Sequence, residues 1–149
     1  MKPSKIKVIK AKRAHLLLPG FKAIMLFGIL YCRKKTDIDS INETDEINSQ
    51  LKSHETIHIR QAEDCKNSWF IYYMRYIWQW ICNLPLIVID SHAPYKFIPF
   101  EIEAYTYQNN WEYCKGKCDA WRRFRKLSIK EKRIYAKEYY RTHKWPITV

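Results

Sequence analysis

Residues 54–58 read His-Glu-Thr-Ile-His, with two histidines four positions apart on either side of a glutamate. In an α-helix, residues four apart lie one above the other on the same face, so both imidazoles can bind one metal ion. The polar residues before His54 contain no proline, and apolar residues continue at Ala62 and Cys65. The pattern predicts a helix that begins at or before His54, ends near Cys65 and carries half of a metal site.

Glu55 follows the first histidine and faces a slightly different direction on the same helix. Its carboxylate can therefore hold a water molecule at the open position of the metal instead of binding the metal itself. This placement makes Glu55 the candidate general base. The alternative interpretation is a half-buried helix on which two histidines happen to be four residues apart.

A catalytic metal ion normally has three protein ligands, so a third must come from elsewhere in the chain. The candidates are three histidines and two acidic residues, His15, His92, His143, Glu101 and Glu103. His15 lies in a basic segment, and His143 lies in a strongly basic tail that would repel a cation. The two glutamates open a predicted helix, where the helix dipole favours acidic residues with or without a metal ion.

A His-Glu-x-x-His helix followed tens of residues later by a Glu-x-x-Ala helix resembles the gluzincin branch of the zincin-like zinc metallopeptidases. The resemblance rests on residues 54–58 and on Glu101 and Ala104. It implies Glu55 as general base and a zinc ion (Zn²⁺) bound by His54, His58 and Glu101. The resemblance thereby favours Glu101 over Glu103. Only one of the two can point at the metal, because residues two apart on a helix face different directions.

Tyr105 stands where many gluzincins have Asp or Asn, which steadies a ligating histidine. Glu103, Asp64 or a backbone carbonyl group could take that role here. More narrowly, the chain is similar to a group of small, largely uncharacterised bacterial proteins with a metallopeptidase-like site. The shared pattern is His-Glu-x-Ile-His-x-Arg-Gln, then an aromatic helix, then Phe-Glu-x-Glu-Ala-Tyr. This similarity covers residues 21–113 and implies no particular substrate.

Length and composition predict one α+β domain that is mainly helical. The chain has 149 residues and only three glycines, which argues against a turn-rich all-β protein. We expect residues 1–149 to form a single zincin-like domain with a basic N-terminal segment (1–20), a small N-terminal β region and a basic helical tail (119–149). Residues 21–32 predict one strand, or two strands that meet near Gly28.

Two further segments carry local predictions. The polar run 36–53 is the candidate for a mobile loop that gates the metal helix. Ser128 and Glu131 have the spacing of a capping box, which predicts a helix that extends to about Thr142.

Residues 69–81 are almost all aromatic or aliphatic and predict a second helix. Such a composition is typical of a buried core helix or of a helix at a membrane interface, where Trp and Tyr are enriched. Residues 69–89 are about long enough to span a bilayer, but Arg75 lies inside the segment and Pro85 interrupts it. The core helix is the favoured interpretation.

Charge is distributed unevenly along the chain, whose net charge is +12. Residues 1–35 contain ten Lys or Arg and no acid, whereas residues 36–114 contain five basic and twelve acidic groups. Residues 115–149 contain twelve basic and three acidic groups. The basic ends predict contact with an anionic membrane surface or a solvated helix face, and the absence of a recognised module argues against nucleic acid as a partner.

The five cysteines form no Cys-x-x-Cys pair, and no cleavage site follows the basic N-terminal residues. Reduced thiols and a cytoplasmic location are therefore expected, with membrane association as a further possibility.

The function predicted from these features is zinc-dependent hydrolysis of a peptide or protein substrate. The donor to the developing oxyanion is left open among His92, Tyr95 and Tyr105. Two alternatives remain: a binding or regulatory protein that keeps the zincin scaffold without catalysis, and a basic nucleic-acid or membrane-surface protein in which the histidine pair is incidental.

Overall fold

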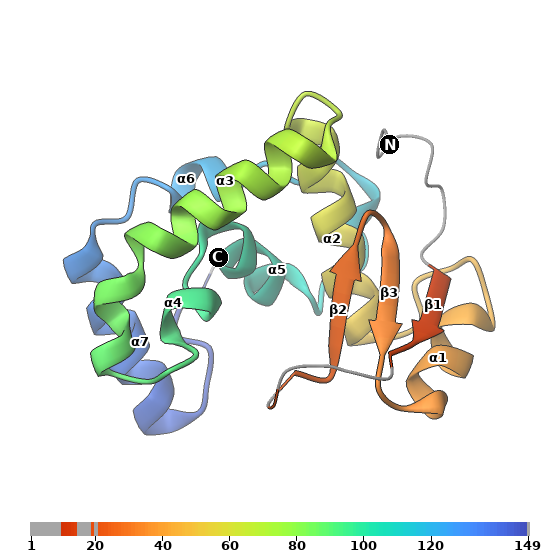
Figure 1. Ribbon diagram of the computed structural model, residues 1–149, viewed down its shortest axis with the longest axis horizontal. Helices are drawn as coiled ribbons and strands as arrows, with labels where there is room; N and C mark the ends of the chain where they lie inside the picture. Colours follow the sequence, from red (N-terminus) through yellow and green to blue (C-terminus); the bar gives the residue numbers. More distant parts are fainter. Residues whose placement is uncertain (1–9, 15–18, 20, 149) are drawn as a thin grey trace.

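The computed structural model describes residues 10–14, 19 and 21–148 (Figure 1). Within this part of the chain, a small mixed sheet comes first and the helices follow it. The mainly helical α+β class predicted from the sequence is therefore confirmed. Most of the basic segment 1–20, including His15, lies outside the described residues.

Three short strands form the sheet in the order β1-β3-β2. β1 (Lys10–Arg13) runs parallel to β3 (Ile29–Cys32), and β2 (Ala23–Leu26) runs antiparallel to β3. Phe27 and Gly28 join β2 to β3 with φ angles of 50° and 82°, as in the two-residue turns that match the twist of a hairpin. The predicted pair of strands meeting near Gly28 is confirmed.

α1 (Lys35–Asn42) packs against β1 and occupies part of the run predicted as a mobile loop. That prediction was wrong for this part, because Ile38 and Ile41 give an otherwise polar helix an apolar side. Asn42 joins the helix to the strand, since its side-chain amide donates to Ala11 O (3.0 Å) and accepts from Ala11 N (2.9 Å).

α2 (Gln50–Asp64) carries the histidine pair and is the most buried long helix of the described chain. It begins after Ser49, whose hydroxyl accepts a hydrogen bond from Lys52 N (3.2 Å). The Lys52 side chain is itself buried, and its ammonium group donates to Ile41 O (2.9 Å). The helix ends at its C-cap Cys65, as the sequence predicts.

α3 (Trp69–Cys82) is followed directly by a 3-10 helix, η2 (Leu84–Val88). The favoured interpretation of α3 as a core helix was wrong, because only one of its sides is buried. The buried residues of α3 are Trp69, Tyr72 and Gln79. Figure 1 shows α3 along the outer edge of the molecule. No helix among the described residues is long and apolar enough to cross a membrane.

The remaining helices complete the half of the molecule that lies away from the sheet. α5 (Pro99–Tyr107) packs against α2, and α6 (Trp121–Phe124) packs against α5. The short helices α4 (Ala93–Lys96) and η3 (Tyr113–Lys115) precede and follow α5.

α7 (Ile129–Thr142) packs against η2 near the C-terminal end of the described chain. It begins with the predicted capping box, in which Ser128 and Glu131 each bind the backbone N–H of the other. Both the cap and the predicted end of this helix are confirmed.

The main apolar core lies where the sheet, α1, α2, α3 and α5 meet. Its fully buried side chains include Leu30, Cys32, Ile41, Ala62, Ile98 and Phe100. This core fixes α2 against both the sheet and α5, and so determines what faces the histidine pair.

Candidate metal centre

The two histidines of α2 and one glutamate of α5 form a buried group that could hold a metal ion. His54 Nε2 lies 3.3 Å from Glu101 Oε2, and His58 Nε2 lies 3.3 Å from Glu101 Oε1. One ligand atom of each residue lies within 4.8 Å of those of the other two. All three side chains are buried, with Glu101 only 1% exposed.

Helix packing brings the glutamate to the histidines. Pro99 occupies the first position of α5 and places Glu101 in the first turn, where the helix dipole favours a carboxylate. One turn later, the small and fully buried Ala104 belongs to the same apolar cluster as Ile57 of α2. The Glu-x-x-Ala spacing therefore places the acidic group and the contact between the helices on one side of α5.

The Nδ1 atom of each histidine is held by a glutamine. His58 Nδ1 lies 2.9 Å from Gln61 Oε1, and His54 Nδ1 lies 3.2 Å from Gln108 Oε1. The orientation of the Gln61 amide is fixed because its Nε2 donates to two acceptors, Phe100 O (2.9 Å) and Glu103 Oε2 (2.8 Å). Its oxygen must then accept from His58, which places a hydrogen on Nδ1 and leaves Nε2 to bind a proton or a metal ion.

Electrostatics favour a cation between these side chains. Burial alone lowers the pKa of His58, but the charge and hydrogen bond of Glu101 outweigh this effect and raise the pKa to about 9. Burial raises the pKa of Glu101, and the imidazoles of His58 and His54 more than reverse this effect, so the pKa lies below its ordinary value. The His58 imidazole and the Glu101 carboxylate therefore each favour the charged form of the other.

The donor set fits a metal ion. Glu101 Oε1 accepts a hydrogen bond from the Tyr76 hydroxyl (2.7 Å). The buried Oε2 has the His54 imidazole 3.3 Å away, but it accepts no hydrogen bond of good geometry from the described residues. A buried carboxylate oxygen without a partner is costly unless a cation satisfies it. Two imidazole Nε2 atoms and one carboxylate are also a usual protein ligand set for zinc with an open position.

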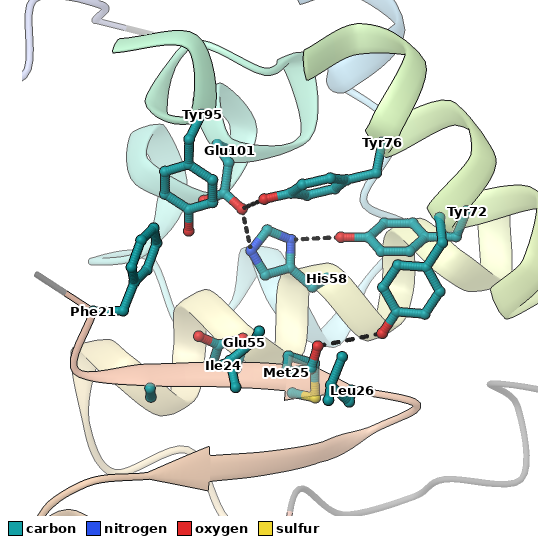
Figure 2. Close-up of a pocket in the computed structure, with 12 residues that line it drawn as sticks. Phe21, Ile24, Met25, Leu26, Glu55, His58, Tyr72, Tyr76, Tyr95 and Glu101 are labelled. Atoms are coloured by element: carbon teal, nitrogen blue, oxygen red, sulfur yellow. Dashed lines mark hydrogen bonds and ion pairs between the residues drawn. The ribbon is translucent and has the colours of Figure 1, made fainter. Parts of the chain in front are cut away.

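Glu55 lies beside this group and also has a buried oxygen, Oε2, without a hydrogen-bond partner among the described residues. Burial raises the pKa of Glu55, and the nearby imidazoles of His58 and His54 oppose that shift. Figure 2 shows Glu55 and His58 extending from α2 into the same pocket as Glu101.

Two cavities meet at the site. The first, of about 340 Å³, lies between β2 and the tyrosines of α3, and Glu55, His58 and Glu101 line it (Figure 2). The second, of about 760 Å³, is lined by His54 and Glu55. Substrate-sized space is therefore present next to each histidine.

The three candidate oxyanion donors are placed differently. Tyr95 lines both cavities. Tyr105 contacts the His54 ring edge-on, with ring centroids 4.7 Å apart. His92 is half-exposed at the larger cavity, and its Nδ1 lies 3.2 Å from Ser91 Oγ. All three line the larger cavity together with Glu55, and Tyr95 also lines the smaller one with it.

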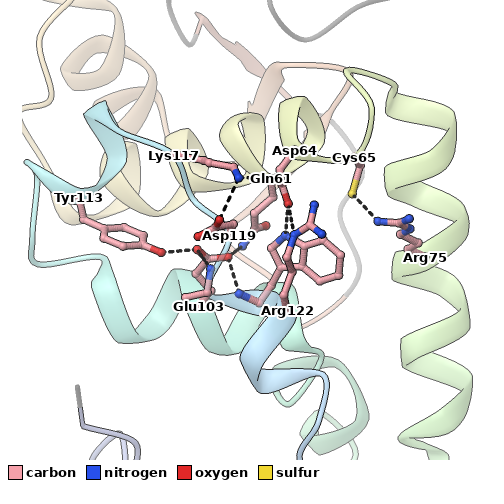
Figure 3. Close-up of polar contacts among 11 residues, drawn as sticks. Gln61, Asp64, Cys65, Arg75, Glu103, Tyr113, Lys117, Asp119 and Arg122 are labelled. Atoms are coloured by element: carbon pink, nitrogen blue, oxygen red, sulfur yellow. Dashed lines mark hydrogen bonds and ion pairs between the residues drawn. The ribbon is translucent and has the colours of Figure 1, made fainter.

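Glu103 faces away from the metal group, as expected for a residue two positions after Glu101. Its carboxylate accepts from Gln61 Nε2 and from the backbone N–H groups of Ala120 (3.0 Å) and Trp121 (3.1 Å). The Tyr113 hydroxyl also donates to Glu103 (Figure 3). Glu103 thus holds the glutamine that holds His58. The other acidic candidate, Asp64, pairs instead with Arg122 (2.8 Å).

Sequence reasoning missed four side chains that contact the metal group, Gln61, Tyr72, Tyr76 and Gln108. Gln61 could have been found, because it lies three residues after His58 on the same predicted helix face. Gln108 and the tyrosines reach the site only through the packing of α3 and α5, which no local pattern reveals. His143, the basic-tail candidate, lines the larger cavity without joining the metal group.

Comparisons of the chain with protein-family models, curated proteins and solved structures find no match.

Proposed function

We propose that the protein is a zinc-dependent peptidase. The observation that carries the proposal is the buried group of His54, His58 and Glu101, with Glu55 beside it and two cavities that reach it. In such a site, zinc polarises the scissile carbonyl group and activates a water molecule for attack.

Glu55 is the residue that moves the proton in this proposal. Its unpartnered Oε2 can accept a hydrogen bond from water, and its raised pKa makes the carboxylate a stronger base than an exposed glutamate. The same carboxyl group then delivers the proton to the leaving amine. His54, His58 and Glu101 hold the metal ion, and the two glutamines keep the imidazole rings in place.

Tyr95 is the proposed donor to the carbonyl oxygen. Burial raises the pKa of Tyr95 well above its ordinary value, so the hydroxyl keeps its hydrogen at neutral pH. Figure 2 shows the Tyr95 ring above the pocket, opposite β2. A hydroxyl held there can stabilise negative charge as it develops on the substrate.

β2 supports a peptide as the substrate, because it is an edge strand of the sheet and its residues 23–26 line the first cavity. An extended peptide can pair with such an edge through its main chain. The Tyr73 hydroxyl already donates to Met25 O (3.3 Å) and accepts from Phe27 N (3.0 Å), which covers one end of this edge. A peptide would then pair with the part of the edge around Ala23.

Hydrolysis of a quenched fluorescent peptide library, measured beside the Glu55→Gln variant, tests this proposal. We expect the wild-type protein loaded with zinc to cleave part of the library, and the variant to lose at least about 100-fold in rate, because the general base is removed. The variant must keep its zinc, since Glu55 is not a ligand. Cleavage that survives unchanged in Glu55→Gln would contradict the assignment, and retained zinc without any cleavage would favour the catalytically silent scaffold.

A further inference from the structure

The outer side of α3 is an apolar stripe that no described residue covers. Its members recur at helical spacing and are Phe70, Met74, Ile77, Trp78 and Ile81. Phe70 is 74% exposed and Trp78 is 66% exposed, values that are unusual for such large apolar side chains. The opposite side of α3 packs against the core, so the stripe itself has no packing partner among the described residues.

The exposed surface extends beyond α3. Ile87 and Val88 of η2 continue it at one end of the helix. On one flank, the exposed Phe27 of the β2–β3 turn contacts Tyr73 of α3, with ring centroids 5.3 Å apart. We refer to the stripe, Ile87, Val88 and Phe27 together as the apolar face. Contiguous exposed apolar surface of this kind marks an interaction site on a soluble domain.

A basic cluster borders the apolar face on its other flank. The guanidinium group of Arg75 lies 5.4 Å from the Trp121 ring centroid, and those of Arg122 and Arg125 lie 5.2 and 5.7 Å from it. Asp64 pairs with Arg122 and so offsets one of these charges. Arg123 and Lys126, both exposed on and beside α6, add to the positive charge.

We propose that the apolar face binds the surface of a bilayer that contains anionic lipid, with α3 lying in the plane of the interface. Helices that bind in this way have Trp, Phe and Ile on one side and basic groups along the edge of that side. The arginines would contact lipid phosphate groups while the stripe enters the acyl boundary. A second copy of the chain is the less suitable occupant, because two chains of net charge +12 repel each other.

α3 is too short to cross the bilayer, so binding at the surface is the arrangement that its length permits. The inference does not rest on the proposed peptidase activity, because none of the residues of the apolar face is a metal ligand. Metal-free protein should therefore bind vesicles as well as zinc-loaded protein does.

Flotation with vesicles of phosphatidylglycerol and phosphatidylcholine tests the proposal, with vesicles of phosphatidylcholine alone in parallel. We expect the wild-type protein to float with the anionic vesicles and to be released as salt is raised. The double variant Met74→Glu/Trp78→Glu should bind at least about tenfold more weakly, since two exposed apolar side chains are lost from the interface. Trp111→Glu, which changes an exposed tryptophan outside the apolar face, should bind like wild type.

Depth in the membrane provides a second measurement. Vesicles with brominated acyl chains should quench the tryptophan fluorescence of wild type and of Trp111→Phe, and should quench that of Trp78→Phe clearly less. Far-UV circular dichroism checks that each variant is folded. The proposal is overturned if wild type fails to bind anionic vesicles, if the double variant binds equally well, or if wild type forms a dimer that the double variant abolishes while vesicles have no effect.

Discussion

At the scale of single residues, the main finding is that each candidate metal ligand has a partner that fixes its direction. Gln61 and Gln108 hold the Nδ1 atoms of the two histidines, and Tyr76 holds one oxygen of Glu101. Tyr105, which follows Ala104, contacts the His54 ring edge-on, and two amide side chains hold the imidazole Nδ1 atoms. A sequence read locally cannot show this, because Gln108 lies 54 residues away from His54.

Replacing Gln108 tests the role of these amides, since this half-buried residue at the end of α5 holds His54 through its side-chain oxygen. Gln108→Leu should weaken zinc affinity by about tenfold or more, because the imidazole loses the acceptor that orients it. Competition with a chromophoric chelator measures this affinity.

Gln50→Leu is the matched control, because Gln50 is an amide side chain of α2 whose partner is Asn109 and not a histidine. It should leave zinc affinity unchanged. Equal loss in both variants would show that the orienting contact has no effect on the metal.

At the scale of elements, the sequence predicted best where the signal is local. The histidine spacing and the Ser128–Glu131 capping box located α2 and α7. α3 was correctly predicted as a helix but wrongly assigned to the core, because a segment that is apolar on every side carries no signal for which side packs. α1 was missed because its apolar side consists of few residues and depends on contact with β1.

The contact of α7 with η2 makes a prediction about pH. Lys132 is buried, its ammonium group donates to Asn83 Oδ1 (2.8 Å), and burial lowers its pKa to about 8. In the unfolded chain the lysine has its ordinary pKa near 10.5. Between pH 8 and pH 10.5 the unfolded chain therefore binds more protons than the folded chain. The free energy of unfolding should therefore rise from pH 8 to pH 10.5, relative to a Lys132→Met variant, by roughly 2 to 3 kcal/mol.

Urea denaturation of both proteins across this pH range measures the difference between their free energies of unfolding. The titration of groups that both chains contain cancels in this difference. Parallel pH dependence of wild type and Lys132→Met would mean that the buried lysine has an ordinary pKa. A difference that falls with pH would show that the folded state favours the charged form.

At the scale of the whole molecule, a sheet and a set of helices place a buried group that could hold a cation next to two cavities, and they leave an apolar face exposed. The sequence singled out His54, His58 and Glu101, and the structure brings them together. The sequence could not predict the positions of the cavities or of the apolar face, because these depend on how α3 lies against β2 and α6. The arrangement of residues 1–149 as one domain stays a prediction, as do the substrate and the cellular location.

Metal content per chain, determined by inductively coupled plasma mass spectrometry, tests the central claim most directly. We predict about one zinc per chain in the wild-type protein and in Glu55→Gln, and its loss in His58→Ala and Glu101→Ala, because only the latter two remove ligands. A wild-type protein that binds no zinc even after reconstitution, or that keeps it in both ligand variants, would contradict the metal centre and the function built on it.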